Sequence, residues 1–301
     1  MKKILLTLMS YRKSINKDQL HNKKGIYYKK NEETPYTGKT IGYYETGEIK
    51  CKENYKDGLK NGKVIGYYED GKIKYKENYK DGEKNGEWIS YHKNGKIETK
   101  GNCKDGEKNG RWITYYETGE IKYKEHYKDG EKNREWVSYH KNGKIEIKAN
   151  YKDGEKNGKW ITYYETGEIK YKEHYKDGKK NGGWTSYHKN GKIENRVNYR
   201  EGEKNGKVIG YYGNGEIKYK QNFKDGLRDG EWTTYYENGE VKYKANYKDG
   251  ERNGEWTSYH KNGEIEIKAN YKDGLKNGEW ISYYKNGKIK GKQNFKDGIM
   301  Y

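Results

Sequence analysis

The stretch GEWISYHKNGKIETKGNCKDGEKN, residues 86–109, decides the fold because the rest of the chain copies it. From Gly38 to Tyr301 it recurs every 24 residues without insertion or deletion, which makes eleven copies. A fixed period of this length is typical of repeat architectures, in which each repeat packs only on its neighbours. The sequence therefore predicts an array of repeats.

Within each repeat, two segments alternate in the manner of half-buried strands, GEWISYHK (residues 86–93) and KIETKGNCK (residues 96–104). Asn94-Gly95 between them is a strong signal for a short hairpin turn. The link KDGEKNG (residues 104–110) joins one hairpin to the next, with glycines supplying positive φ. We predict an all-β fold, an elongated single-layer antiparallel β-meander built of 24-residue β-hairpin repeats.

The register of the hairpin decides which side chains share a face of the sheet. A two-residue turn would place Tyr91 opposite Glu98, whereas a three-residue turn with a glycine bulge places Tyr91 opposite Ile97 and Ile89 opposite residue 99. Threonine often takes the first turn position, as at Thr118, and tolerates positive φ poorly, which favours the bulged turn. This register predicts an apolar face with Ile89, Tyr91, Ile97 and Cys103, and a second face with Trp88, Ser90 and His92 beside Glu98, Lys100 and Asn102.

The composition excludes a conventional core but not an ordered structure. Only 30% of the 301 residues are hydrophobic and the net charge is +19, yet 36 tyrosines and 8 tryptophans recur in strict register. Cross-strand aromatic pairs along such columns can replace a core. The two cysteines, Cys51 and Cys103, lie about two repeats apart, or roughly 19 Å, too far for a disulfide. We therefore expect free thiols.

Three regions follow from the repeats: an N-terminal tail, cap or degenerate signal over residues 1–24, an irregular entry hairpin over 25–37, and eleven repeats over 38–301. The apolar run ILLTLM after Lys2 and Lys3 is short for a secretory signal and has no small-residue cleavage site. This favours the cytoplasm, with secretion or a periplasmic location as the alternative if residues 1–24 act as a signal. No stretch is apolar enough to predict a transmembrane segment.

The stretch YKDGEKNGKWITYYETG, residues 151–167, resembles the MORN repeat pattern of an aromatic residue, spaced glycines and a tyrosine-containing strand that ends in a glycine turn. The repeats, with the entry segment IYYKKNEETPYTGK, are most similar to the MORN variant of bacterial YwqK-family antitoxins. The resemblance covers residues 25–301. It implies an elongated sheet of hairpins that binds partners, and it associates the chain with neutralising a toxin. In one repeat Arg134 replaces the expected glycine.

The chain offers no catalytic, cofactor or metal site that we can predict. His92, His140 and His188 are separated by two repeats, roughly 19 Å, whereas zinc ligands must converge on one ion. Acidic and amide side chains near Asp81 suit turns better than a calcium loop. GLKNGKV (residues 58–64) is one residue short of a phosphate-binding loop. A ladder of identical groups does not concentrate the unlike groups that an active site requires.

Basic and aromatic columns are the strongest functional signal. Lysine or arginine fills the Lys100 position in every repeat, and this ladder either keeps the sheet soluble or attracts an acidic partner. With tryptophan beside it, such a surface is typical of protein-binding hot spots. The predicted partner-binding residues are Trp88, Trp112, Trp136, Trp160, Lys100, Lys124, Lys148 and Lys172.

The expected partner is a protein, in particular an acidic toxin. The alternatives are a secreted or surface-exposed adhesive array, an anionic membrane surface, or nucleic acid bound by aromatic platforms and lysines. Nucleic acid is the least favoured, because 46 acidic residues are interleaved with the 65 basic ones.

Overall fold

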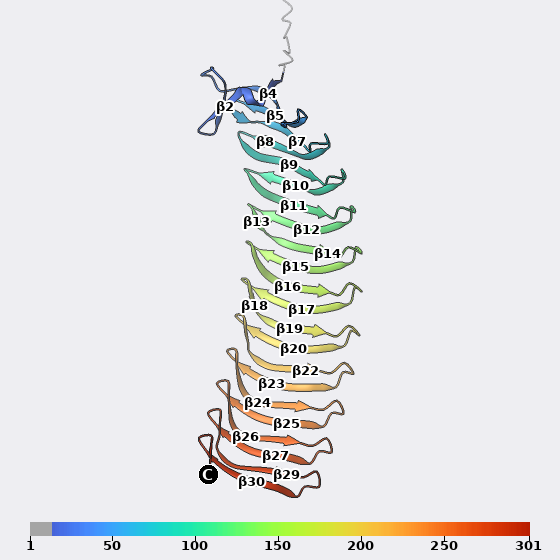
Figure 1. Cartoon of the computed structure of the whole chain (residues 1–301), viewed down its shortest axis with the longest axis vertical. Coiled ribbons are helices and arrows are strands. Elements are labelled where there is room, and N and C mark those ends of the chain that lie inside the picture. The colour runs from blue at the N-terminus through green and yellow to red at the C-terminus, as the bar shows by residue number, and fades with distance from the viewer. Residues whose placement is uncertain (1–13) are drawn as a thin grey trace, which may run out of the picture. The chain divides into compact units, whose positions relative to one another are not determined.

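The computed structural model describes residues 14–301, and contacts divide the chain into two units, Met1–Gly143 and Lys144–Tyr301. In each unit the strands of the repeats form an open antiparallel sheet in which hairpins follow one another in chain order (Figure 1). This confirms the predicted all-β meander of hairpin repeats. Within residues 14–301, we find no helix with the length and apolar character needed to cross a membrane.

The first unit has one 3-10 helix, η1 (Lys17–Gln19), and the strands β1 (Ile15–Asn16), β2 (Leu20–Lys23), β3 (Ile26–Lys29), β4 (Gly38–Tyr43), β5 (Ile49–Lys56), β6 (Leu59–Lys60), β7 (Gly62–Tyr67), β8 (Ile73–Lys80), β9 (Glu83–Tyr91), β10 (Ile97–Lys104), β11 (Glu107–Tyr115), β12 (Ile121–Lys128), β13 (Glu131–Lys132) and β14 (Arg134–Tyr139). The second unit has the strands β15 (Ile145–Lys152), β16 (Glu155–Tyr163), β17 (Ile169–Lys176), β18 (Lys179–Lys180), β19 (Gly182–Tyr187), β20 (Ile193–Arg200), β21 (Glu203–Lys204), β22 (Gly206–Tyr211), β23 (Ile217–Lys224), β24 (Leu227–Tyr235), β25 (Val241–Lys248), β26 (Glu251–Tyr259), β27 (Ile265–Lys272), β28 (Leu275–Lys276), β29 (Gly278–Tyr283), β30 (Ile289–Lys296) and β31 (Ile299–Met300).

The turn between β9 and β10 has the predicted three-residue form. The backbone N–H of His92 donates to the Lys96 carbonyl at 2.8 Å, and Gly95 has a φ of 86°. Tyr91 consequently lies opposite Ile97, as the bulged register predicts.

The link between hairpins is shorter than predicted. Lys104 pairs with Glu107, so only Asp105 and Gly106 form the turn, with φ values of 48° and 84°. Two successive residues with positive φ are the requirement of a tight type I′ hairpin turn, which Asp-Gly favours. The rest of the predicted link belongs to the next strand, where Gly110 (φ 77°) lies in a bulge. The prediction of positive φ at these glycines is confirmed, whereas the predicted length of the link is too great.

The predicted composition of the two faces is wrong. A further bulge at Glu98 shifts the pairing by one residue, so Ile89 lies opposite Lys100 and Trp88 lies opposite Gly101. Trp88 therefore shares a face with Cys103, and Lys100 lies on the other face with Ile89. Since side chains alternate across a strand, one extra residue exchanges the faces for every position beyond it.

The tryptophan-bearing face is the buried one. Trp112 is 3% exposed and packs with Cys103 and Tyr127, against which Trp88 also lies. The aromatic columns thus act as the core of the first unit. Cys51 and Cys103 are free thiols, as predicted.

The N-terminal segment packs on the first repeat, residues 38–61. β1 pairs in parallel with β4, and β2 pairs with β3 in a separate hairpin (Figure 1). From η1, Lys17 Nζ reaches Glu53 Oε2 at 2.9 Å, while the ring centres of Tyr27 and Tyr55 lie 5.1 Å apart. The short apolar run at residues 4–9 lies outside the described residues, and the division of the chain at residues 24 and 37 stays a prediction.

Candidate partner-binding faces

The tryptophan-bearing face, here called the aromatic face, carries a basic column that the sequence did not reveal. The Asp-Gly turn sets Lys84 opposite Tyr79 and Lys132 opposite Tyr127, so these lysines lie on the face that holds the aromatic rings. The column consists of Lys60, Lys84, Lys108, Lys132, Lys156, Lys180, Lys204, Arg228, Arg252 and Lys276.

These cations lie over the rings. Lys108 Nζ is 4.5 Å from the ring centre of Trp112 and 4.7 Å from that of Tyr127. Lys156 Nζ is 3.9 Å from the ring centre of Trp160. Such cation–π contacts contribute about 0.5–2 kcal/mol each, depending on how far the cation is desolvated. The aromatic face is therefore both basic and aromatic in each unit.

Carboxylates neutralise part of this column. Glu77 accepts hydrogen bonds from Trp88 Nε1 at 2.8 Å and Tyr79 OH at 2.9 Å, and its Oε1 lies 2.9 Å from Lys84 Nζ. The same lysine–glutamate pairing is made by Glu53, Glu125 and Glu173 with the lysine seven residues later.

The protonation of these groups follows from their surroundings. Burial acts to raise the pKa of Glu77, but hydrogen bonds from Lys84, Trp88 and Tyr79 outweigh it and hold that pKa below its ordinary value. In the equivalent repeat, burial together with the Glu173 carboxylate raises the pKa of Tyr175 to about 12. At neutral pH the aromatic face thus holds ionised carboxylates beside neutral phenols.

The opposite face carries the lysines that were predicted to bind a partner. Lys100 Nζ lies 5.8 Å from the ring centre of Tyr115, and Lys124 Nζ lies 5.0 Å from that of Tyr139. Each lysine therefore rests on the tyrosine of the following repeat. We call this the lysine–tyrosine face.

The structure does not bring the two predicted sets together. Trp112 pairs with Glu125 while Ile113 pairs with Lys124, and Ala149 pairs with Trp160 while Lys148 pairs with Ile161. The tryptophans Trp88, Trp112, Trp136 and Trp160 line the aromatic face, whereas Lys100, Lys124, Lys148 and Lys172 belong to the lysine–tyrosine face. The lysines beside the tryptophans are those of the Lys84 column. The Asp-Gly dipeptide is the sequence signal that identifies them, through the two-residue turn that it favours.

Histidine replaces tyrosine in one column without gathering a metal site. Tyr68 OH donates to the Tyr91 carbonyl at 2.7 Å, and His92 Nε2 lies 3.1 Å from the Tyr115 carbonyl oxygen. Both side chains bridge to the backbone 23 residues later. Among residues 14–301, no group of three or more His, Cys, Asp or Glu side chains is arranged to hold a metal ion.

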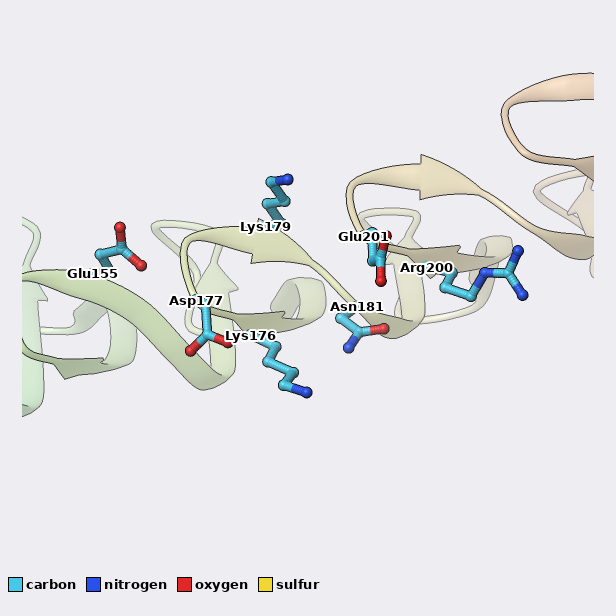
Figure 2. Close-up of a pocket in the computed structure, with 7 residues that line it drawn as sticks. All are labelled: Glu155, Lys176, Asp177, Lys179, Asn181, Arg200 and Glu201. Atoms are coloured by element: carbon cyan, nitrogen blue, oxygen red, sulfur yellow. The ribbon is translucent and has the colours of Figure 1, made fainter.

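A polar pocket of about 500 Å³ lies among the turns of the second unit. Its side chains point in different directions, with Lys179 directed away from Lys176 and Asp177 (Figure 2). Nothing in this arrangement converges on one reacting atom, as an active site requires. The lining residues are Glu155, Lys176, Asp177, Lys179, Asn181, Arg200 and Glu201.

Comparison with known families gives one extensive match. The family model described as MORN repeat variant matches residues 36–57, 60–81, 84–105, 108–129, 135–153, 156–177, 180–201, 204–225, 228–249, 252–273 and 276–297. No curated protein matches the chain.

Solved structures give weak similarities. The crystal structure of TcdB2-TccC3 is 9% identical over 91% of this chain and 22% of that chain, with a TM-score of 0.18, so our chain spans about a fifth of it. The Photorhabdus luminescens Tc holotoxin pore is 12% identical over 85% of this chain and 16% of that one, with a TM-score of 0.19. Choline binding protein F from Streptococcus pneumoniae is 16% identical, with coverages of 90% and 92% and a TM-score of 0.17. Similarities at these TM-scores carry no argument about the chain.

Proposed function

Since the chain belongs to the MORN repeat variant family, we propose that it is a non-enzymatic scaffold that binds an acidic protein through its aromatic face. The observation that carries the proposal is the placement of cations over rings, as with Lys108 on Trp112 and Lys156 on Trp160. Aromatic and basic side chains in one ordered surface provide the residue types of binding hot spots, and a positive field attracts acidic partners.

The resemblance to YwqK-family antitoxins gives this binding a specific purpose. In our proposal the scaffold is the antitoxin of a toxin–antitoxin pair, and it neutralises an acidic toxin by covering its surface. The absence of converging unlike groups in the described repeats supports a binding role over a catalytic one.

The test uses the full-length chain to capture partners from its native host at low and at high salt. We expect a discrete acidic protein, identified by mass spectrometry, whose capture weakens at high salt because screening reduces electrostatic attraction. Co-expression then asks whether that protein inhibits growth alone and is harmless with the scaffold. Recovery of nucleic acid or lipid in place of a protein would refute the proposal.

Matched variants identify the binding face. We expect Lys108→Gln with Lys156→Gln to weaken capture, because both lysines lie on the aromatic face. Lys100→Gln with Lys172→Gln removes the same charge from the lysine–tyrosine face and should leave capture nearly unchanged. The reverse result would transfer the binding role to the lysine–tyrosine face.

A further inference from the structure

The carboxylates of the aromatic face stop partway along the second unit, while the cations continue. The column that contains Glu53, Glu77, Glu125 and Glu173 is interrupted at Gly101 and Ala149. After Glu173 it continues without any carboxylate as Val197, Gln221, Ala245 and Ala269. The basic column beside it continues without a break as Lys204, Arg228, Arg252 and Lys276. Within residues 14–301, none of these four cations forms an ion pair, whereas Lys180, one repeat earlier, lies 2.9 Å from Glu173.

The repeats that contain a carboxylate show how this face holds an anion. Around Glu77, the donors are Lys84 and the indole N–H of Trp88, both on the neighbouring strand β9. Around Gln221, the equivalent groups are Arg228 and Trp232. Trp232 Nε1 is buried and has no hydrogen-bond acceptor within the described residues. The donors are thus retained in a repeat where the internal carboxylate is missing.

We propose that Arg228 and Arg252 bind carboxylates of an acidic segment of a protein partner. This inference rests on the proposed function and names the part of the aromatic face that performs it. Both arginines are exposed, and the guanidinium of Arg228 lies 3.9 Å from the ring centre of Trp232. Arginine offers a planar pair of donors that matches a carboxylate, and stacking on a ring fixes its orientation.

The spacing of the cations suits an extended segment. Arg228 and Arg252 are two strands apart, or roughly 9.6 Å, and the series from Lys204 to Lys276 spans roughly 29 Å. A segment of about ten residues reaches roughly 33 Å when extended. Four carboxylates on such a segment can therefore meet four successive cations.

The rings are arranged for a carboxylate and not for nucleobases. Bases bind single-strand proteins by stacking on open ring faces. Here Arg228 covers Trp232, and Trp256 is stacked between Tyr243 and Trp280 with ring centres 6.4 and 6.0 Å away. A base would have to displace these neighbours. A carboxylate can accept from Arg228 and from the N–H groups of Arg252 that do not donate to the hydroxyls of Tyr247 and Tyr271.

The test measures binding of a fluorescent peptide of about ten glutamates to the full-length chain at low salt. Arg228→Gln with Arg252→Gln should weaken binding roughly tenfold, as the loss of two exposed charge pairs predicts. The control is Arg196→Gln with Arg200→Gln, which removes the same total charge. Arg196 lies on the lysine–tyrosine face, and Arg200 forms an ion pair with Asp225 at the turns. The control should change binding less than threefold, roughly.

Gln221→Glu tests the site by restoring the internal carboxylate that this repeat lacks. The substitution is isosteric and places a carboxylate beside Arg228 and the Trp232 indole, so it should weaken peptide binding and raise the midpoint of thermal unfolding. Equal losses in the arginine variant and its control would overturn the proposal, because they would show attraction to net charge alone. Tighter binding of oligothymidine or of phosphatidylserine vesicles than of the peptide, lost in the arginine variant, would overturn it in favour of those ligands.

The partner-capture experiment separates this inference from the proposed function. If the wild-type chain captures an acidic protein and the Arg228/Arg252 variant captures it equally well, the inference fails and the scaffold function stands. If no protein is captured by the wild-type chain, the scaffold function fails. The peptide experiment then tests only whether Arg228 and Arg252 bind carboxylates.

Discussion

Trp88 donates its indole N–H to Glu77 across the β8–β9 pair, at 2.8 Å from the carboxylate oxygen. The same carboxylate is 2.9 Å from Lys84 Nζ, and the Lys84 ammonium lies 5.9 Å from the Trp88 ring centre. One carboxylate, one cation and one ring thus satisfy one another on the buried face. This arrangement lets a chain with few aliphatic residues bury charged groups without leaving them unpaired.

Acidification should destabilise the protein through these carboxylates. The pKa of Glu77 is held below its ordinary value in the folded state. Its stabilisation is therefore complete above the pKa of the unfolded chain and is lost as pH falls through the folded pKa. We expect the midpoint of thermal unfolding, followed by circular dichroism, to fall as pH is lowered from about 5.

Glu77→Gln should remove part of that dependence. The variant should lose about 1–3 kcal/mol at neutral pH, because Lys84 keeps its charge without its partner. It should also respond less to acid than the wild type does. Glu107→Gln, at an exposed position, serves as the control and should resemble the wild type at both pH values. An acid response that is unchanged in Glu77→Gln would assign the effect to other groups.

Arg134→Gly should stabilise the first unit. Arg134 has a φ of 69° where the other repeats place glycine at this step, and a left-handed conformation costs a residue with a β-carbon about 1 kcal/mol. We expect a higher midpoint of thermal unfolding. Arg111→Gly, at a β11 position that pairs with His126 and does not have a positive φ, should lower the midpoint because glycine costs entropy in a strand. A midpoint for Arg134→Gly that is unchanged or lower would contradict the argument from φ.

Tyr68→Phe should destabilise the first unit by about 1 kcal/mol. The phenol OH donates to the Tyr91 carbonyl at 2.7 Å, and phenylalanine fills the same space without that donor. Tyr67→Phe is the matched control, since the Tyr67 hydroxyl makes no hydrogen bond within residues 14–301. Chemical denaturation of both variants measures the difference. Equal stabilities would mean that the carbonyl is equally well solvated when the phenol OH is removed.

Much of the fold could be predicted from the sequence because its signals are local. The 24-residue period, the glycine at position 95 and the opposition of Tyr91 to Ile97 all follow from turn chemistry. Arg134 was also placed correctly in a column that requires positive φ.

The composition of the faces could not be predicted, because it depends on one residue that no turn rule marks. Glu98 forms an additional bulge just after the turn, and this moves Lys100 away from Trp88 and onto the opposite face. The contact of Lys84 with Trp88 could be predicted only by treating Asp-Gly as a tight two-residue turn, and the longer predicted link obscured it. The 24-residue period alone therefore does not determine which face of the sheet a side chain occupies.

The bonds that join the repeats also determine how the protein should unfold. Asn61 Nδ2 donates to Asp81, Gly82 N donates to the Lys60 carbonyl, and Tyr68 OH reaches Tyr91, so each of these links spans no more than one repeat length. In a structure held together by nearest neighbours, a disturbance at one repeat weakens the next in turn. Unfolding should therefore begin at the repeats with the fewest packed neighbouring repeats and proceed along the chain. Amide hydrogen exchange should detect this as a gradient of protection within each unit.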